Sequence, residues 1–329
     1  MWDFSFGKSV GMVLRTLPFL LLRIAVYLGI AIIYIFAAGI GAAFGFALGR
    51  MGADADSPVS GAFIGGAIGF GLTAIVLYFL RQYLLYLVKA AHIAVLVEIL
   101  DGRSIPAGQG QIGYGVQFVK NHFAEASVLF GVDQVVKAIL RALFRIINLF
   151  TMFLPIPLLG NLIRIAEAVV RNSLTYVDEV ILAYLIRTRT TNPWETAKDG
   201  VILYAQNYRT MLKNAVWLSV FMWGMTLLIF ALLLAPAAGF MMWMPGTNAV
   251  GIWAFMFAVV VAVALKKALL EPLAIASLMQ VYFKVIEGQK PDPEWSARLD
   301  GASRGFRALG QKAAGWVPRP PMPEPGAAK

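Results

Sequence analysis

The chain has 329 residues, of which 59% are hydrophobic types and 14% are charged, and its mean hydropathy is +0.72. Soluble domains contain about 45–50% apolar and about 25% charged residues, so an ordinary soluble globular protein is excluded. There is no cysteine, and the two histidines, His92 and His122, lie far apart. Disulfides, thiolate chemistry and multi-histidine metal centres are therefore excluded. The net charge of +10 favours a protein beside an anionic membrane surface.

Long apolar runs predict membrane-spanning helices, because a helix needs about 20 apolar residues to cross the hydrocarbon core. The clearest runs are 17–48, 61–80, 214–236 and 250–265. Two more runs, 126–156 and 158–186, are long enough but carry charges, and the segments 82–100 and 268–286 continue earlier runs. We predict an all-α, polytopic membrane helical bundle with about six embedded helices.

Charge asymmetry predicts the orientation of these helices. The turns 50–61, 154–160 and 236–251 contain few charges, whereas basic residues gather on the other side. Those residues are Lys8, Arg15, Arg23, Arg103, Lys120, Arg187, Arg189, Lys198, Arg209 and Lys213, with further ones in the C-terminal tail. Because the cytoplasmic side carries the excess of Lys and Arg, we expect both termini in the cytoplasm. We expect a multi-pass protein of a bacterial inner (plasma) membrane.

A threefold pattern divides the predicted membrane domain, residues 1–295, into hairpin units at about 4–106, 107–193 and 194–291. Each unit begins with an amphipathic segment that we place on the cytoplasmic side. Each unit closes near a proline, Pro106, Pro193 or Pro291. Residues 296–329 are rich in Pro, Gly and Ala, and we predict a disordered cytoplasmic tail.

The first hairpin carries two ladders of glycines spaced four residues apart. They are Gly41, Gly45 and Gly49, and then Gly61, Gly65 and Gly69. Small residues at this spacing let two helix backbones approach closely in lipid, so we expect them to pack the hairpin as a glycine zipper. A self-association face or a sliding hinge is the alternative.

The middle hairpin combines charges with apolar runs. Lys137, Arg141 and Arg145 share one helix face, which Asp133 precedes by one turn. The following helix bears Arg164, Glu167, Arg171, Asp178 and Glu179. Since charges are costly at the bilayer centre, these residues cannot all face lipid. They line a polar cavity, lie at the interface on anionic headgroups, or form a buried ion-pair network, and the sequence leaves all three interpretations open.

In the last hairpin, Lys267, Glu271 and Pro272 follow one another within two turns. A mid-helix proline kinks a helix, and an ionisable cluster beside a kink suits a gate or a binding site. The simpler interpretation is an ordinary kink in which Glu271 pairs with Lys267. The lone His92 is better interpreted as a packing residue than as a proton relay.

Three segments resemble the later membrane helices of the choline transporter-like family. They are EASVLFGVDQVVKAILRAL at 125–143, VVRNSLTYVDEVILAY at 169–184 and KDGVILYAQNYRTMLKNAV at 198–216. The resemblance extends over about residues 82–290, and Arg171, Asn172 and Tyr176 are the positions that match the family's pattern. The family's early helices, large extracellular loop and cysteines are missing here. The resemblance implies a transporter-like helical bundle for an amine- or lipid-related solute.

Two function classes remain. The first is a transporter- or channel-like protein for a small solute. The alternative is a non-catalytic membrane scaffold or assembly factor that binds anionic lipid or a protein partner. We expect no enzyme activity and no cofactor, because the sequence contains no nucleophile–base pair or phosphate loop. The expected partners are anionic membrane lipids and a second copy of the chain, without nucleic acid. The candidate site residues are Asp133, Lys137, Arg141, Arg145, Arg164, Glu167, Arg171, Asn172, Tyr176, Asp178, Glu179, Lys267 and Glu271.

Overall fold

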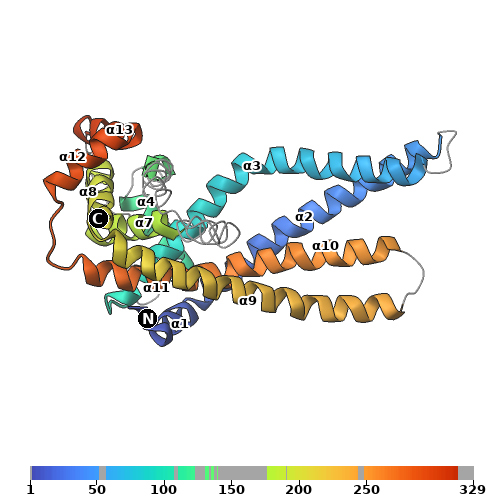
Figure 1. Ribbon diagram of the computed structural model, residues 1–329, viewed down its shortest axis with the longest axis horizontal. Helices are drawn as coiled ribbons and strands as arrows, with labels where there is room; N and C mark the ends of the chain where they lie inside the picture. Colours follow the sequence, from blue (N-terminus) through green and yellow to red (C-terminus); the bar gives the residue numbers. More distant parts are fainter. Residues whose placement is uncertain are drawn as a thin grey trace, which may run out of the picture. The chain divides into compact units, whose positions relative to one another are not determined.

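The computed structural model describes residues 2–51, 57–106, 110–122, 130–132, 135, 136, 139, 176–189, 191–243 and 248–317. In that part of the chain every regular element is a helix, which confirms the all-α class (Figure 1). The helices are α1 (Phe6–Arg15), α2 (Leu17–Gly49), α3 (Ser57–Leu100), α4 (Gln111–His122), α7 (Val177–Thr188), α8 (Pro193–Gln206), α9 (Tyr208–Trp243), α10 (Asn248–Leu265), the π-helix η2 (Lys266–Leu270), α11 (Glu271–Val285), α12 (Pro293–Ala302) and α13 (Arg304–Ala314).

Three helical stretches are long and apolar enough to cross a membrane. They are Leu17–Gly49, Ser57–Ile75 and Tyr208–Ala235. The larger number of embedded helices and their threefold repetition stay predictions, because most of the run 126–175 lies outside the described residues. Helix α3 has 44 residues. At a rise of about 1.5 Å per residue it is much longer than a hydrocarbon core of about 30 Å.

The chain forms two compact units. Unit 1 contains Met1–Phe19, Leu87–Met222 and Pro272–Lys329, and unit 2 contains Leu20–Tyr86 and Trp223–Glu271. Unit 2 therefore holds most of the apolar length of α2, α3, α9 and α10, whereas unit 1 holds most of the polar sequence.

Two helical hairpins make up unit 2, and Figure 1 shows α2 beside α3 and α9 beside α10. The glycine ladders lie where α2 meets α3, because a Cβ atom on Gly41 would overlap the carbonyl of Gly65, and one on Gly45 would overlap that of Gly61. Gly49 meets the Ser57 carbonyl and Gly69 meets that of Ala37 in the same way. Side chains larger than hydrogen cannot occupy these positions while the backbones stay this close.

The two hairpins of unit 2 meet in a small apolar cluster. Tyr27 and Ala31 of α2 pack there against Ala264 of α10 and Ala268 of η2. The α9–α10 pair is joined by the rings of Phe230 and Phe255, whose centroids are 5.7 Å apart. The first contact thus combines one aromatic ring with three alanines, whereas the second is made by two aromatic rings.

Unit 1 is built around helices that are buried on every side. Residues 90–98 of α3 are all buried, as are 176–183 at the start of α7 and 272–279 within α11. A helix covered on all sides belongs to the interior of a larger body. His92 lies in this interior, 2.8 Å from the Thr16 hydroxyl and stacked on Phe19, in agreement with the interpretation as a packing residue.

The prediction that residues 296–329 are disordered is wrong for the residues up to Ala314. Helices α12 and α13 fold onto α8, and Phe306 and Leu309 of α13 are fully buried. Ser303 caps α13, since its hydroxyl accepts from the Phe306 N–H at 3.2 Å. An N-cap followed by apolar residues at i+3 and i+6 forms an amphipathic helix with a face to bury. Residues 318–329 lie outside the described part.

Within the described residues, a positive φ occurs at Gly102 (+73°), Arg189 (48°) and Gly288 (+71°). Each lies in one of the predicted closing segments, three or four residues before Pro106, Pro193 or Pro291. At the first of them, the Arg103 N–H reaches back to the Glu98 carbonyl at 2.8 Å, as in a Schellman motif. Glycine adopts this conformation without strain, whereas Arg189 does not.

Candidate functional site

The described structure includes only part of the candidate site predicted from the sequence. Tyr176, Asp178, Glu179, Lys267 and Glu271 are described. The remaining candidates, Asp133, Lys137, Arg141, Arg145, Arg164, Glu167, Arg171 and Asn172, lie outside the described residues. Among the residues that are described, charge is buried at three places, two in unit 1 and one in unit 2.

The first place is the start of α7. Asp178 and Glu179 occupy its first turn, where the helix dipole favours negative charge. Both are buried, with 4% and 2% of their surfaces exposed, and Tyr176 precedes them with 3% exposed. Lys89 of α3 forms an ion pair with the Glu179 carboxylate. Glu179 is therefore a buried carboxylate with a cationic partner, Lys89, that the sequence analysis did not place in the candidate site.

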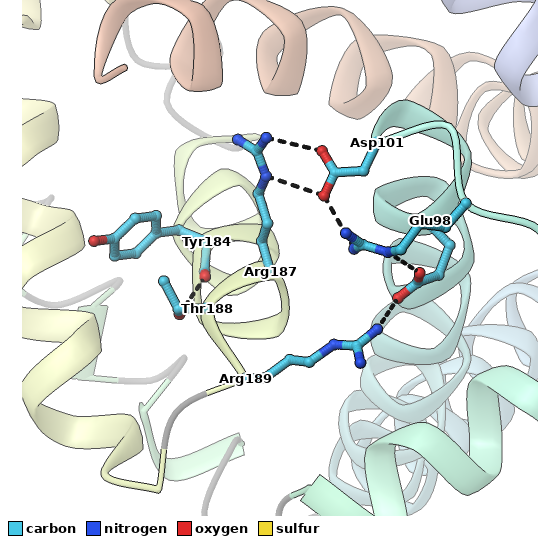
Figure 2. A network of polar contacts seen from close by, with 7 residues as sticks. Glu98, Asp101, Tyr184, Arg187, Thr188 and Arg189 are labelled. Carbon is cyan, nitrogen blue, oxygen red and sulfur yellow. Dashed lines mark hydrogen bonds and ion pairs between the residues drawn. The ribbon is translucent and has the colours of Figure 1, made fainter. Parts of the chain in front are cut away.

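The second place joins the end of α3 to the end of α7. Figure 2 shows Arg187 and Arg189 reaching from α7 toward the carboxylates of Asp101 and Glu98. Arg187 Nη2 lies 2.8 Å from Asp101 Oδ1, and Arg189 Nη2 lies 3.0 Å from Glu98 Oε1. Arg103 pairs with both carboxylates. Two acids thus meet three guanidinium groups, and we call this set the α3–α7 clasp.

Within the clasp, the positive charges of the arginines offset the cost of burying the Glu98 carboxylate. Burial raises the pKa of Glu98, but the hydrogen bonds and charges of Arg103 and Arg189 outweigh this effect, so its pKa is lowered overall. The Tyr114 hydroxyl has a raised pKa because of burial and because of the negative charge of Glu98. The arginines are 43% and 47% exposed, so water solvates the part of each guanidinium that the carboxylate leaves uncovered. Such a satisfied network fixes the positions of two helix ends.

The third place is the ion pair between Arg23 and Glu271 in unit 2. Arg23 belongs to α2, and its side chain is 1% exposed, while that of Glu271 is 6% exposed. Their closest atoms, Nη2 and Oε2, are 3.6 Å apart, which is longer than a hydrogen bond. The Nε and Nη1 atoms of Arg23 have no hydrogen-bond partner among the described residues. The buried guanidinium of Arg23 therefore lies near a carboxylate and has two nitrogen atoms without a hydrogen-bond partner among the described residues.

The helix around Glu271 is irregular for a reason that the sequence explains. Pro272 has no N–H, and the N–H of Glu271 donates to the Lys266 carbonyl, five residues back instead of four. The carbonyls of Lys267 and Ala268 are therefore released from the regular α-helical pattern. A π-turn of this kind is frequent at functional sites.

The pairing of Glu271 with Lys267, which the i−4 spacing predicted, is wrong. The ion pair of Glu271 is with Arg23 instead, and Lys267 is exposed. The π-turn changes the spacing on which the prediction relied, because a residue four positions before Glu271 no longer lies one regular α-helical turn away. Arg23, expected among the basic residues of the cytoplasmic side, is instead buried beside Glu271. Its place inside the apolar run 17–48 is a signal from which its burial could have been predicted.

No group of three or more His, Asp and Glu side chains in the described residues is placed to hold a metal ion. No family model, no curated protein and no solved structure matches the chain. The chemistry of these residues is therefore the basis for a functional assignment.

Proposed function

We propose that the protein is an integral membrane protein that moves a small charged solute, and that Arg23 and Glu271 form its polar site. The observation that carries the proposal is a buried guanidinium with unused donors in the unit that contains the apolar helices. Ionisable residues inside membrane segments are costly and are usually functional. Buried polar atoms are normally hydrogen-bonded, so the two unused nitrogen atoms of Arg23 call for an explanation.

The pair also suggests the kind of solute. A guanidinium with free donors binds a carboxylate or a phosphate, and a carboxylate binds an ammonium group. A zwitterionic amine carries both charges, so it could replace the interaction between Arg23 and Glu271 with one to each partner. This fits the amine- or lipid-related solutes that the resemblance to the choline transporter-like family implies.

Local irregularity supports a site that can change its shape. The π-turn η2 and Pro272 interrupt the helix directly beside Glu271, so a small change of backbone pattern there would move the carboxylate. The left-handed residues Gly102, Arg189 and Gly288 support the threefold repeat on which many transporter folds are built. We further propose a bacterial inner membrane with both termini in the cytoplasm, testable by labelling tags at each end from one side.

Flux into liposomes tests the proposal. Purified full-length protein is reconstituted and exposed to radiolabelled choline, glycine betaine and phosphocholine, with protein-free liposomes as the control. We expect saturable uptake of at least one zwitterionic probe. Absence of uptake for all three probes, with the protein shown to be folded and inserted, would contradict the proposal.

A scaffold function is the second candidate, and the folded C-terminal helices favour it. Helices α12 and α13 enlarge unit 1 with basic residues, and Arg298, Arg304 and Arg307 are exposed. Such a body suits an anionic lipid surface or a protein partner. Purification of the intact complex from membranes, with and without residues 293–329, tests this alternative: an unchanged set of bound partners would weigh against it.

A further inference from the structure

A polar cavity of about 510 Å³ lies at the junction of α8 and α9, in unit 1. Its lining residues are Gln206, Asn207, Tyr208, Arg209, Thr210, Trp295 and Arg298. The volume is within the range of small-ligand sites, about 300–1,000 Å³. The lining carries two guanidinium groups and no carboxylate, so it favours an anion.

Local sequence builds this cavity. Asn207 separates α8 from α9, and its side-chain amide donates to Gln289 Oε1 at 2.7 Å. Gln206 donates to the same oxygen at 3.0 Å and accepts from the Asp292 backbone N–H, also at 3.0 Å. Asp292 caps α12. This set of amides therefore holds the start of α12, with Trp295 in its first turn and Arg298 in its second, near the first turn of α9.

Rings and cations alternate along the lining. The rings of Tyr208 and Trp295 have centroids 6.2 Å apart. Arg209 lies 5.8 Å from the Tyr208 centroid, and Arg298 lies 5.3 Å from that of Trp295. The Nε atom of Arg209 donates to the Tyr208 hydroxyl at 3.1 Å, and Arg298 pairs with the exposed Glu294 at 2.6 Å. Since a guanidinium has five N–H donors, each side chain keeps donors for a ligand.

The position of the cavity along the chain indicates the source of the anion. Helix α9 starts at Tyr208 with polar residues, and its apolar run begins near Ala215, about 10 Å further along the axis. The stretch Tyr208–Ala235 is one of the three that could cross a membrane. The cavity therefore lies where the chain leaves the apolar layer. Aromatic rings and basic side chains at this level are typical of headgroup contacts.

We propose that this cavity binds the phosphate-bearing headgroup of an anionic phospholipid. Arg209 and Arg298 hold the phosphate, and the rings of Tyr208 and Trp295 contact the glycerol end of the lipid. The inference rests on the membrane placement in the proposed function but not on transport. If the protein bound the lipid but moved no solute, the lipid site would be supported and only the transport proposal would be contradicted.

Binding of short-chain lipids to the purified full-length protein tests the assignment. The probes are dihexanoyl phosphatidylglycerol, its zwitterionic phosphatidylcholine counterpart and inorganic phosphate, with Kd measured by calorimetry. The test variant is Arg209→Gln with Arg298→Gln. The matched control is Lys120→Gln with Lys284→Gln, which removes the same charge from exposed positions outside the lining. All four side chains are exposed, so folding is retained.

We expect the anionic lipid to bind at least about tenfold more tightly than the zwitterionic lipid, and the test variant to lose at least about tenfold in Kd. The control is expected to keep its affinity. Glu294→Gln frees Arg298 from its carboxylate and is expected to tighten binding. Equal losses in test and control variants would overturn the proposal in favour of general surface charge. Displacement of the lipid by equimolar inorganic phosphate would overturn the lipid assignment in favour of a free-phosphate site.

Discussion

The two units each bury a glutamate next to arginine, but in opposite ways. Glu98 in unit 1 accepts from Arg103 and from Arg189, whose guanidinium groups are about half exposed. Glu271 in unit 2 faces an Arg23 guanidinium that is 1% exposed and 3.6 Å away. The first carboxylate is buried and its cations are solvated, whereas in the second pair both charges are removed from water.

This difference separates a structural ion pair from a functional one. A buried carboxylate that is fully hydrogen-bonded by surface arginines stabilises the fold, because the cost of burial falls on one group only. When both members of an ion pair are buried, desolvation can exceed their attraction, so the pair contributes little stability. We therefore expect changes in the α3–α7 clasp to affect folding, and changes at Arg23 and Glu271 to affect activity.

The largest expected effect on stability comes from the glycine contact in unit 2. In Gly65→Leu the new side chain would have to displace the Gly41 carbonyl of α2, so we expect loss of the folded hairpin and several kcal/mol of stability. Gly71→Leu is the control, because nothing lies within 4 Å of its Cβ position. Thermal unfolding in detergent measures both. A Gly65→Leu protein as stable as the control would show that α2 and α3 are not packed through glycine.

A smaller loss is expected in the α3–α7 clasp. Glu98→Gln leaves Arg103 and Arg189 without their shared charge, and we expect a cost of about 1–3 kcal/mol, reduced because both arginines are partly solvated. Solute flux is expected to persist in the folded fraction. If Glu98→Gln abolished flux without lowering stability, the division between the two regions would be wrong.

The same carboxylate predicts a response to acid. The pKa of Glu98 is lower in the folded chain than its ordinary value of 4.5, so the folded state binds this proton more weakly than the unfolded state. Its contribution is complete above pH 4.5 and is lost as the pH falls through the lowered value. Unfolding curves recorded from pH 6 downward should therefore show a steeper loss in the wild type than in Glu98→Gln. Parallel curves would contradict this role.

The smallest effect on stability is expected at Arg189, where backbone strain and an ion pair act in opposite directions. Its left-handed backbone lowers the stability by about 1–2 kcal/mol, and its ion pair with Glu98 offsets part of this loss. Arg189→Gly removes both, so we expect a net change of less than about 1 kcal/mol. Arg189→Ala keeps the strain and loses the pair, and we expect it to be the less stable of the two variants. The reverse order would show that the backbone strain is not significant.

The sequence predicted the features that depend on residues close together in the chain. The apolar run 17–48 became α2, and the glycine spacing indicated residues that lie at the α2–α3 contact. The Arg23–Glu271 pair joins residues 248 positions apart, and no spacing rule connects them. Helix α13 was missed because the composition of the Pro-rich terminus obscured a short amphipathic helix that begins at a serine cap.

Removing both charges at once tests the central claim most directly. In Arg23→Leu with Glu271→Leu, two buried charges are replaced by apolar side chains, a change that is often neutral or stabilising in a buried pair. We predict that the double variant inserts and unfolds at a temperature equal to or above that of the wild type, and that zwitterion flux into liposomes is lost. Wild-type flux in this folded double variant would contradict the account, because the pair would then have no part in moving solute.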